Sequence, residues 1–520
     1  MKLTCVPIAK LPALAWGLKL IRGHQTVSVL HGPRVEIGAD HFVEGAWSGA
    51  FRDRSFALAT TFCGTGGLCD HQGLLLSSST NTLQPIYLIR MAEELIASNS
   101  LALTLQLANS ELNRQYRYHD VDLMSIMLGL RRYQRSLLTE SGVRVALFYH
   151  CNVRVLPDLG VQQLAKARLD KPLTYAQYAG MLFQQTAAVV ANAIDVERRT
   201  RFRPMTTISS GYDSPACAVL ARAAGCSEAM TFARAAEAID CNDDSGSKIA
   251  ENLGLSVVEF DPCAYKTAPG LPEVEFLAPG YGGDDVIYRG AEAVLADRLL
   301  FVGYHGDRIW GRSTGLGANF ERGDPSGGSL QEFRLRVGFL ALAVPFIGCE
   351  HFKDIRNISN SADMRPWSVS LTGYDRPIPR RLVEEAGVPR GSFGQLKKAA
   401  ARPARAADIE DPPIHNFLSP ASLVQFTQWS KNIPLYLGVW DWVRHLVLHQ
   451  TYMAFAWLAS GLLYLFPASK GLGLHWLFWQ RIGPVPWKYA KPRSVHSLLI
   501  FWAHEHIRAR YAPYIPPRWR

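Results

Sequence analysis

The chain has 520 residues, of which 48% are hydrophobic and 19% are charged. This balance excludes an intrinsically disordered protein and predicts a globular chain of roughly two to four domains. The formal net charge of +10 favours an anionic partner such as a nucleotide, although the chain contains no dense run of Lys and Arg. The nine cysteines are an odd number without regular spacing, which is not the pattern of a secreted disulfide framework.

The N-terminal segment, residues 1–23, is the place where a signal peptide would lie. Pro7, Lys10 and Pro12 interrupt it, so it lacks the continuous apolar stretch that a signal peptide needs. We therefore expect a cytoplasmic protein.

The first candidate site lies in residues 205–225. Met205–Ile208 is apolar and typical of the end of a buried strand, and Pro215–Ala224 is typical of the first turns of a helix. The loop between them reads SSGYDS, and Gly211 in this loop allows a ligand to approach the backbone closely. Backbone N–H groups and hydroxyls converge at such a junction, where the helix N-terminus favours an anion. The pattern is that of a phosphate-binding loop.

Asp213 in the same loop indicates a cation, because a carboxylate repels phosphate unless a cation lies between them. This residue predicts Mg²⁺ bridging Asp213 and a polyphosphate. No Walker-type G-x-x-x-x-G-K-[ST] motif occurs in the chain. A helix start capped by serine and aspartate explains the loop by itself equally well, so the surrounding elements decide between the two interpretations.

The following segments have the order of a βαβ fold. Residues 229–235 predict a second strand, and residues 240–261 predict an acidic loop, a helix and a third strand. Residues 299–311 (LLFVGYHGDRIWG) predict another buried strand, which ends in a glycine-rich loop carrying Asp307. Because sites in parallel sheets lie at the carboxyl ends of the strands, we expect Asp213 and Asp307 to share one metal–nucleotide site.

These two loops together resemble a known family. SSGYDS is similar to the PP-loop (S-G-G-x-D-S) of ATP pyrophosphatases, and its pairing with GYHGDRIWG resembles the asparagine synthetase superfamily. The resemblance implies an α/β fold in which a PP-loop (adenine nucleotide alpha-hydrolase-like) parallel-sheet synthetase domain has a helical C-terminal part. It also implies ATP and Mg²⁺ as cofactors, with Asp213 and Asp307 holding the metal. The residues that would contact the nucleotide are Ile208, Ser209, Ser210, Gly211, Asp213, Ser214, Phe232, Gly303 and Asp307. Ser210 stands where the family signature has its first glycine.

The resemblance extends to the N-terminal part of the chain. Residues 73–106 and 143–156 are similar to the family's glutamine-amidotransferase domain, an Ntn-type α+β sandwich. That domain begins with a catalytic cysteine directly after the initiator Met, whereas Lys2 occupies this position here and the nearest thiol is Cys5. We expect a degenerate glutaminase-like domain that does not hydrolyse glutamine, as in β-lactam synthetases and lasso-peptide cyclases.

Residues 374–400 resemble the closing region of the family's synthetase domain, in which a lysine binds pyrophosphate. Lys397 or Lys398 would take that role, and the resemblance does not choose between them.

The loop that contains Tyr304 resembles the corresponding loop of β-lactam synthetases, because its sequence GYHGD is closer to their G-Y-G-S-D than to the loop of asparagine synthetases. In that family a tyrosine paired with a glutamate deprotonates the attacking amine, since an isolated tyrosine with a pKa of about 10 is a poor base. The glutamate would align near Ala341, so Glu350 or Glu332 is expected to substitute for it. His305 is a further candidate proton carrier.

Residues 432–482 are dense in Trp, Leu and Tyr, and residues 451–469 carry no charge. A membrane-spanning helix needs about 20 apolar residues, and Pro467 shortens this stretch. Buried core helices are the first interpretation, and a peripheral membrane or partner-binding surface is the second. Residues 397–417 are expected to form a flexible connector before these helices.

The expected domains are residues 1–190 (degenerate glutaminase-like), 191–405 (ATP-binding synthetase) and 406–520 (aromatic-rich helical extension of the synthetase domain). Together they predict an ATP-dependent ligase that adenylates a carboxylate substrate, releases pyrophosphate and AMP, and joins the acyl group to an amine; both substrates are small molecules or peptides of unspecified identity. The alternatives are an asparagine synthetase that uses ammonia and a non-catalytic descendant that binds a nucleotide or a partner. No nucleic-acid partner is expected, because the chain has neither a catalytic C-x-x-C pair nor a recognisable RNA-binding module.

Overall fold

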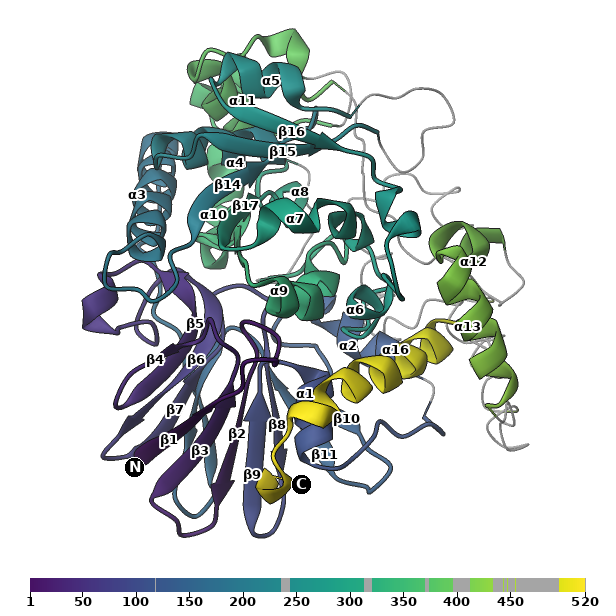
Figure 1. Cartoon of the computed structure of the whole chain (residues 1–520). Coiled ribbons are helices and arrows are strands. Elements are labelled where there is room, and N and C mark those ends of the chain that lie inside the picture. The colour runs from purple at the N-terminus through teal and green to yellow at the C-terminus, as the bar shows by residue number, and fades with distance from the viewer. Residues whose placement is uncertain are drawn as a thin grey trace.

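The structure is a computed structural model of the whole chain. In Figure 1 a sandwich of sheets built by the N-terminal residues lies below a second sheet that is flanked by helices. The fold is therefore mixed α/β, with both parallel and antiparallel sheets. The described residues are 1–116, 118–234, 244–312, 320–369, 374–395, 412–433 and 495–519, together with the single residues 443, 447 and 454.

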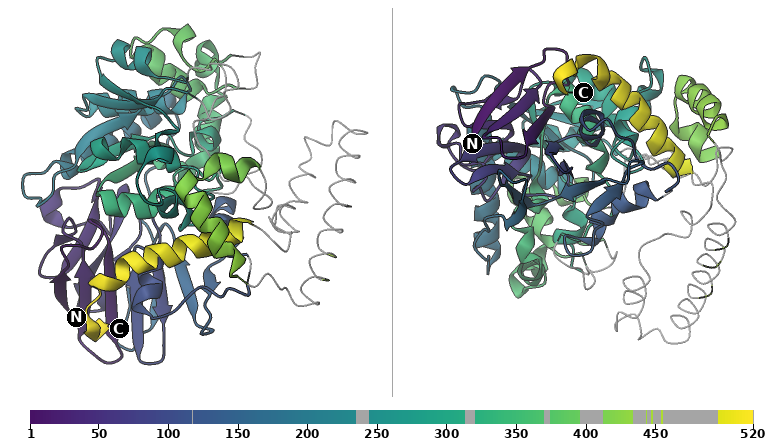
Figure 2. Two further views of the ribbon diagram at one scale, coloured as in Figure 1. Left: turned by 45° about the vertical axis from the view of Figure 1, so that its right-hand side comes forward. Right: turned by 90° about the horizontal axis from the view of Figure 1, so that it is seen from below.

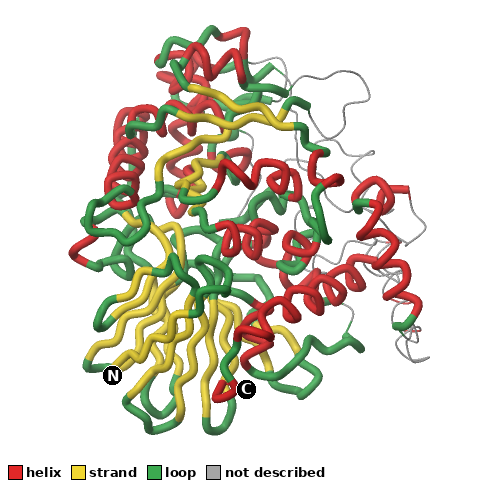
Figure 3. The backbone as a smooth tube through the Cα atoms, in the orientation of Figure 1, coloured by secondary structure: helices red, strands yellow, loops and turns green. Residues whose placement is uncertain are grey.

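The N-terminal part consists of two sheets, one with seven strands and one with six. Their strands lie face to face in Figure 3. Apolar side chains from both sheets, such as Leu18, Leu76 and Val153, are fully buried between them, as expected when alternate residues of each strand face a common core. In spatial order the seven strands are β1 (Lys2–Pro7), β3 (Thr26–His31), β2 (Trp16–Ile21), β9 (Glu94–Ser98), β8 (Ile86–Arg90), β11 (Arg144–Phe148) and β10 (Ser136–Leu138). The six are β13 (Val161–Ala165), β12 (Cys151–Val155), β7 (Gly73–Ser77), β6 (Phe62–Asp70), β5 (His41–Trp47) and β4 (Glu36–Ile37).

The second part contains a sheet of five strands, in which every neighbouring pair is parallel. In spatial order they are β16 (Ser256–Phe260), β15 (Glu228–Phe232), β14 (Arg203–Thr207), β17 (Arg298–Val302) and β18 (Leu340–Ala343). All five residues of β17 are buried, as expected for a parallel strand that is covered on both faces. The strand order reverses between β14 and β17, and ligands of such sheets bind outside the carboxyl ends of the strands at this switch point.

Helix α4 (Asp213–Ala223) connects β14 to the rest of this part. It packs against β14 and β17 and contacts α3 (Tyr175–Ala193) and α11 (Pro377–Glu385). Among the described residues, the other α-helices are α1 (Leu101–Leu107), α2 (His119–Met124), α5 (Ser247–Asn252), α6 (Val274–Leu277), α7 (Glu292–Leu295), α8 (Gly306–Ile309), α9 (Gln331–Val337), α10 (Phe352–Ser359), α12 (Pro412–Phe417), α13 (Pro420–Lys431) and α16 (Val495–Tyr511).

The strands and helices predicted around residues 205–311 are confirmed. β14, β15, β16 and β17 are the predicted strands, and α4 and α5 are the predicted helices. The predicted connector is wrong for its last residues, because residues 412–417 form α12. Ile414 and Phe417 are buried there, and the Tyr265 hydroxyl donates to the Phe417 carbonyl at 2.6 Å. The rest of that segment lies outside the described residues.

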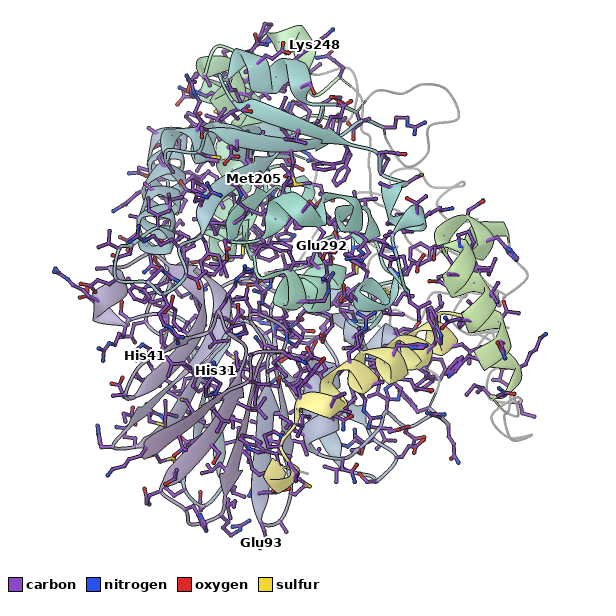
Figure 4. All side chains as sticks on the ribbon, viewed as in Figure 1. His31, His41, Glu93, Met205, Lys248 and Glu292 are labelled. Carbon is purple, nitrogen blue, oxygen red and sulfur yellow. The ribbon has the colours of Figure 1, made fainter. Side chains whose placement is uncertain are left out.

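Buried contacts join the two parts. Helix α16 packs against α1 and α2 of the N-terminal part and against α6 of the second part, so it contacts both parts (Figure 2). Glu44 on β5 and Arg334 on α9 form an ion pair at 2.7 Å, with side-chain exposures of 0% and 1%. Figure 4 places His31, His41 and Glu93 in the sandwich and Met205 in the parallel sheet.

No helix within the described ranges combines the length and the apolar character needed to span a bilayer. Most of residues 432–482 lie outside those ranges. The predicted core helices or membrane-facing surface of this segment therefore stay a prediction.

Candidate active site

The loop after β14 is held together by its own side chains. Ser209 Oγ lies 2.8 Å from Ser214 Oγ and accepts the N–H of Gly211 at 3.3 Å. Ser214 belongs to the first turn of α4. These bonds therefore tie the loop to the N-terminus of the helix, where unpaired N–H groups favour an anion.

Ser210 connects the same loop to other segments through hydrogen bonds. Its hydroxyl donates to Asp244 Oδ1 at 2.8 Å, and its N–H donates to the Asp244 carbonyl at 3.2 Å. The Gly394 N–H donates to the Ser210 carbonyl at 2.8 Å. Ser210 does not line the cavity described below, and these bonds fix the loop; its predicted contact with a nucleotide stays a prediction.

The second loop follows β17 and lies beside the first, because β14 and β17 are adjacent parallel strands. Gly303 and Gly306 of this loop lie against Asp213. A Cβ on Gly303 would be 2.8 Å from Asp213 Cβ, and one on Gly306 would be 2.4 Å from Asp213 Cγ. Only glycine allows the two loops to approach each other so closely.

Both loops border one cavity of about 240 Å³ at the carboxyl ends of the strands. Phe232 and Tyr288 form an aromatic wall, with their ring centroids 5.4 Å apart. The predicted site residues that line the cavity are Ile208, Ser209, Gly211, Asp213, Ser214, Phe232, Gly303, Tyr304, His305 and Asp307.

Acidic side chains dominate the lining. Arg376 is the one Lys or Arg residue that lines the cavity among the described residues. The acidic residues of the lining are Asp213, Asp244, Asp284, Asp285, Asp307 and Asp324. A surplus of carboxylates of this kind favours cations, including a metal ion that is bound together with phosphate.

Arg376 forms an ion pair with Asp213 through Nη1 and Oδ2, and its guanidinium lies 5.1 Å from the centre of the Tyr374 ring. Burial raises the pKa of Asp213, and Asp307 and Asp324 raise it further, whereas Arg376 lowers it. Burial alone would lower the pKa of Arg376, but the neighbouring Asp213 raises it above its usual value. Asp213 Oδ1 is buried and has no hydrogen-bond partner among the described residues.

Tyr304 has a carboxylate partner that the sequence did not identify. Its hydroxyl donates to Asp285 Oδ1 at 3.0 Å and lies 3.1 Å from the Tyr288 hydroxyl. Asp285 Oδ2 also accepts the Ser329 hydroxyl at 2.6 Å and the Gly327 N–H at 2.9 Å. Burial raises the pKa of Tyr304 well above its usual value, and Asp285 adds to this effect, so the phenol is protonated at neutral pH.

Glu350 and Glu332, the expected partners of Tyr304, form other contacts. Glu350 Oε1 accepts the N–H of Leu169 at 3.1 Å, and Glu332 Oε2 accepts the hydroxyl of Tyr511 at 2.9 Å. Neither glutamate lines the cavity. Among the described residues the structure therefore pairs Tyr304 with Asp285.

His305 is buried, with 4% exposure and a φ of +76°. Its ring stacks on Phe346 at 4.6 Å, and neither ring nitrogen has a hydrogen-bond partner within the described part of the chain. Burial lowers the pKa of His305 well below its usual value, and Arg322 and Arg308 act in the same direction. The ring is therefore neutral at physiological pH and can accept a hydrogen bond from a ligand.

The donor set fits Mg²⁺. The described residues include no cluster of three or more His, Cys, Asp or Glu side chains that could hold a metal by itself. Mg²⁺ is commonly bound through one or two carboxylates together with substrate phosphates. Asp213 and Asp307, which both line the cavity, could supply these carboxylates. The buried, unpartnered Oδ1 of Asp213 is a suitable ligand atom. Lys397 and Lys398, the predicted pyrophosphate ligands, lie outside the described residues.

Lys2 begins β1, and the amine of Met1 donates to the Asp70 carbonyl at 3.0 Å. Burial raises the pKa of Cys5 on the same strand. The absence of glutamine hydrolysis stays a prediction.

Asp285 and Arg376 are the residues that sequence reasoning missed. Arg376 lies in the segment 374–400, for which the family resemblance implies a role only for a lysine. Asp285 ends the run GYGGDD, in which glycines before two aspartates are a recognisable loop signal. Nothing in that run indicated proximity to Tyr304, because the contact depends on tertiary folding.

Comparisons with known proteins provide no relative: no protein-family model matches the chain, and no curated protein matches it. Its function must therefore be inferred from the geometry of the cavity.

Proposed function

We propose that the chain is an ATP-dependent, AMP-forming amide ligase. In this proposal the sandwich is an Ntn-type domain without glutaminase activity, and the second part is a PP-loop synthetase domain. The observation that carries the proposal is the pairing of two loops, each with glycine and aspartate, around one cavity at the switch point of a parallel sheet.

The loop after β14 supports phosphate binding. Ser209 and Ser214 supply hydroxyl donors, and the N-terminus of α4 supplies N–H donors. Asp213 and Asp307 would hold Mg²⁺, which when bound supplies Lewis-acid stabilisation of the charge on the phosphates. With Mg²⁺ held at Asp213, the guanidinium of Arg376, which pairs with Asp213 in this structure, would be available to bind the phosphate chain in a bidentate manner.

Tyr304 and Asp285 support the amine step. An amine that attacks an acyl-adenylate must lose a proton, and the Tyr304 oxygen can accept it while the phenolic proton moves to Asp285 Oδ1. Burial raises the pKa of Asp285, which suits a carboxylate that accepts a proton. The aromatic wall of Phe232 and Tyr288 would exclude water from the adenylate.

One observation favours the second candidate, a non-catalytic descendant of the same fold. Arg376 is paired with Asp213, the carboxylate that would hold the metal. A chain that no longer binds Mg²⁺ would gain stability from such a permanent ion pair.

Calorimetry with ATP and Mg²⁺ tests the proposal on wild type, Asp307→Asn and Asp261→Asn. Asp261 is an exposed aspartate outside the cavity lining and serves as the control. We expect binding to wild type and to the control but not to Asp307→Asn, and pyrophosphate release with at least one carboxylate in a panel. ATP binding without pyrophosphate release across the panel would favour the non-catalytic candidate. Absence of ATP binding to wild type would refute the ligase and leave only a descendant that binds a partner.

A further inference from the structure

A second, larger cavity of about 810 Å³ lies at the opposite end of the parallel sheet. It is lined by Arg203, the first residue of β14, and by Gly225, which follows α4. Helix α4 begins at the candidate active site and ends beside this second cavity. At about 1.5 Å per residue its 11 residues separate the two by roughly 16 Å.

Arginine is the characteristic residue of this cavity, which we call the arginine pocket. The charged side chains that line it are Arg34, Arg199, Arg201, Arg203, Glu228 and Asp297. Thr200 and Ser227 add hydroxyl groups. The lining therefore offers many more hydrogen-bond donors than its two carboxylates can accept.

Both carboxylates already form ion pairs with arginines. Asp297 Oδ1 is 2.9 Å from Arg34 Nε, and Asp297 Oδ2 accepts Arg34 Nη2 at 3.0 Å. Glu228 Oε1 accepts Arg298 Nη2 at 2.9 Å, and this hydrogen bond is the main reason why the pKa of Glu228 is lowered.

The remaining arginines, Arg199, Arg201 and Arg203, form no ion pair with any residue that the structure describes. All three side chains are exposed, and Arg201 Nη2 also donates to the Val196 carbonyl at 3.3 Å. An anion with several negative charges would interact favourably with more than one of these cations at once. Guanidinium groups match phosphate and carboxylate oxygens in a bidentate manner.

The backbone that carries these arginines is anchored. Glu36 Oε2 accepts the N–H of Arg199 at 3.3 Å, and Glu36 Oε1 accepts the N–H of Thr200 at 3.1 Å. The Arg203 N–H donates to the Asp297 carbonyl at 3.0 Å, and Arg203 pairs with Arg298 across the sheet. The positions from which the guanidinium groups reach into the pocket are therefore set by the fold of both parts of the chain.

We propose that the arginine pocket binds a small oxyanion of several negative charges, either a short polyphosphate or a polycarboxylate. The site is separate from the candidate active site, and the proposal does not depend on ligase activity.

Isothermal titration calorimetry with tripolyphosphate, and separately with citrate, tests this inference. EDTA and about 50 mM salt are used, so that no divalent cation bridges the probe to Asp213 or Asp307 and the ionic contacts are only weakly screened. The variant is Arg199→Ala/Arg203→Ala. Its control is Arg90→Ala/Arg131→Ala, which removes two exposed arginines that do not line the pocket and changes the net charge equally.

We expect at least one probe to bind wild type and the control equally, and the pocket variant at least about tenfold more weakly. The two probes distinguish a polyphosphate from a polycarboxylate ligand. Absence of binding by both probes, or an equal loss in both double variants, would overturn the proposal, because the arginines would then act only as general surface charge. A single-stranded oligonucleotide that binds through the same arginines and displaces the probe would also overturn it in favour of a nucleic-acid surface.

Discussion

Replacement of Arg376 by alanine is the most informative test of the charge balance in the candidate active site. Arg376 and Asp213 keep only 8% and 19% side-chain exposure, and Asp213 lies close to Asp307 and Asp324. Removal of one member of a buried ion pair costs about 3–5 kcal/mol. Because Asp213 retains some contact with water, we expect Arg376→Ala to lower the free energy of unfolding by ~3 kcal/mol at neutral pH.

The sign of the pH dependence follows from the raised pKa of Asp213. A carboxyl group whose pKa is higher in the folded state stabilises the fold fully below its unfolded pKa of about 3.9, and this contribution is lost as the pH rises through the folded pKa. The loss of Arg376 removes the group that lowers the pKa of Asp213, so the folded pKa rises further. The destabilisation should therefore be larger at pH 8 than at pH 5.

Urea unfolding at the two pH values, in the absence of divalent cations, measures this difference. Arg390→Ala is the control, because Arg390 has 53% exposure in its ion pair with Glu384 and should contribute less than about 1 kcal/mol. Addition of Mn²⁺ should stabilise Arg376→Ala more than wild type, since Asp213 then has no competing arginine. Equal destabilisation at both pH values, or a loss no larger than that of the control, would refute this account of the site.

Three further substitutions test other contacts. Gly306→Ala places a Cβ 2.4 Å from Asp213 Cγ, so we expect the two loops to separate. The affinity for ATP–Mg²⁺, measured by calorimetry, should then fall at least about tenfold. Unchanged affinity would show that binding does not require the close approach of the loops. Tyr304→Phe keeps the ring and removes the hydroxyl that would carry the proton. Amide formation should therefore slow by about 10²–10⁴-fold while ATP binding and pyrophosphate release persist. An unchanged rate of amide formation would exclude proton transfer through Tyr304. Glu44→Gln leaves the buried guanidinium of Arg334 without its counter-charge, so the free energy of unfolding measured in urea should fall by about 3–5 kcal/mol. A decrease below about 1 kcal/mol would contradict the importance of this ion pair.

Local sequence signals predicted most of the parallel sheet. The apolar run before SSGYDS and the alanine-rich run after it correctly predicted β14 and α4, because strand and helix periodicity is a property of neighbouring residues. The strands of βαβ units are parallel, so the approach of Asp213 and Asp307 to the same edge could also be predicted. The hydrogen bonds that fix Ser210 could not be predicted in this way, because their partners Asp244 and Gly394 are distant in the chain.

The sequence by itself determined four strands of the parallel sheet, helices α4 and α5, and the two loops that border the cavity, since these depend on residues close together in the chain. Only the tertiary structure decided which charges meet there. The partners of Asp213 and Tyr304 are Arg376 and Asp285, which lie 163 and 19 positions away along the chain. The arginine pocket likewise gathers residues from both parts of the molecule. Side-chain electrostatics act through space over a few ångströms, so pairs of this kind become visible only when the chain is folded.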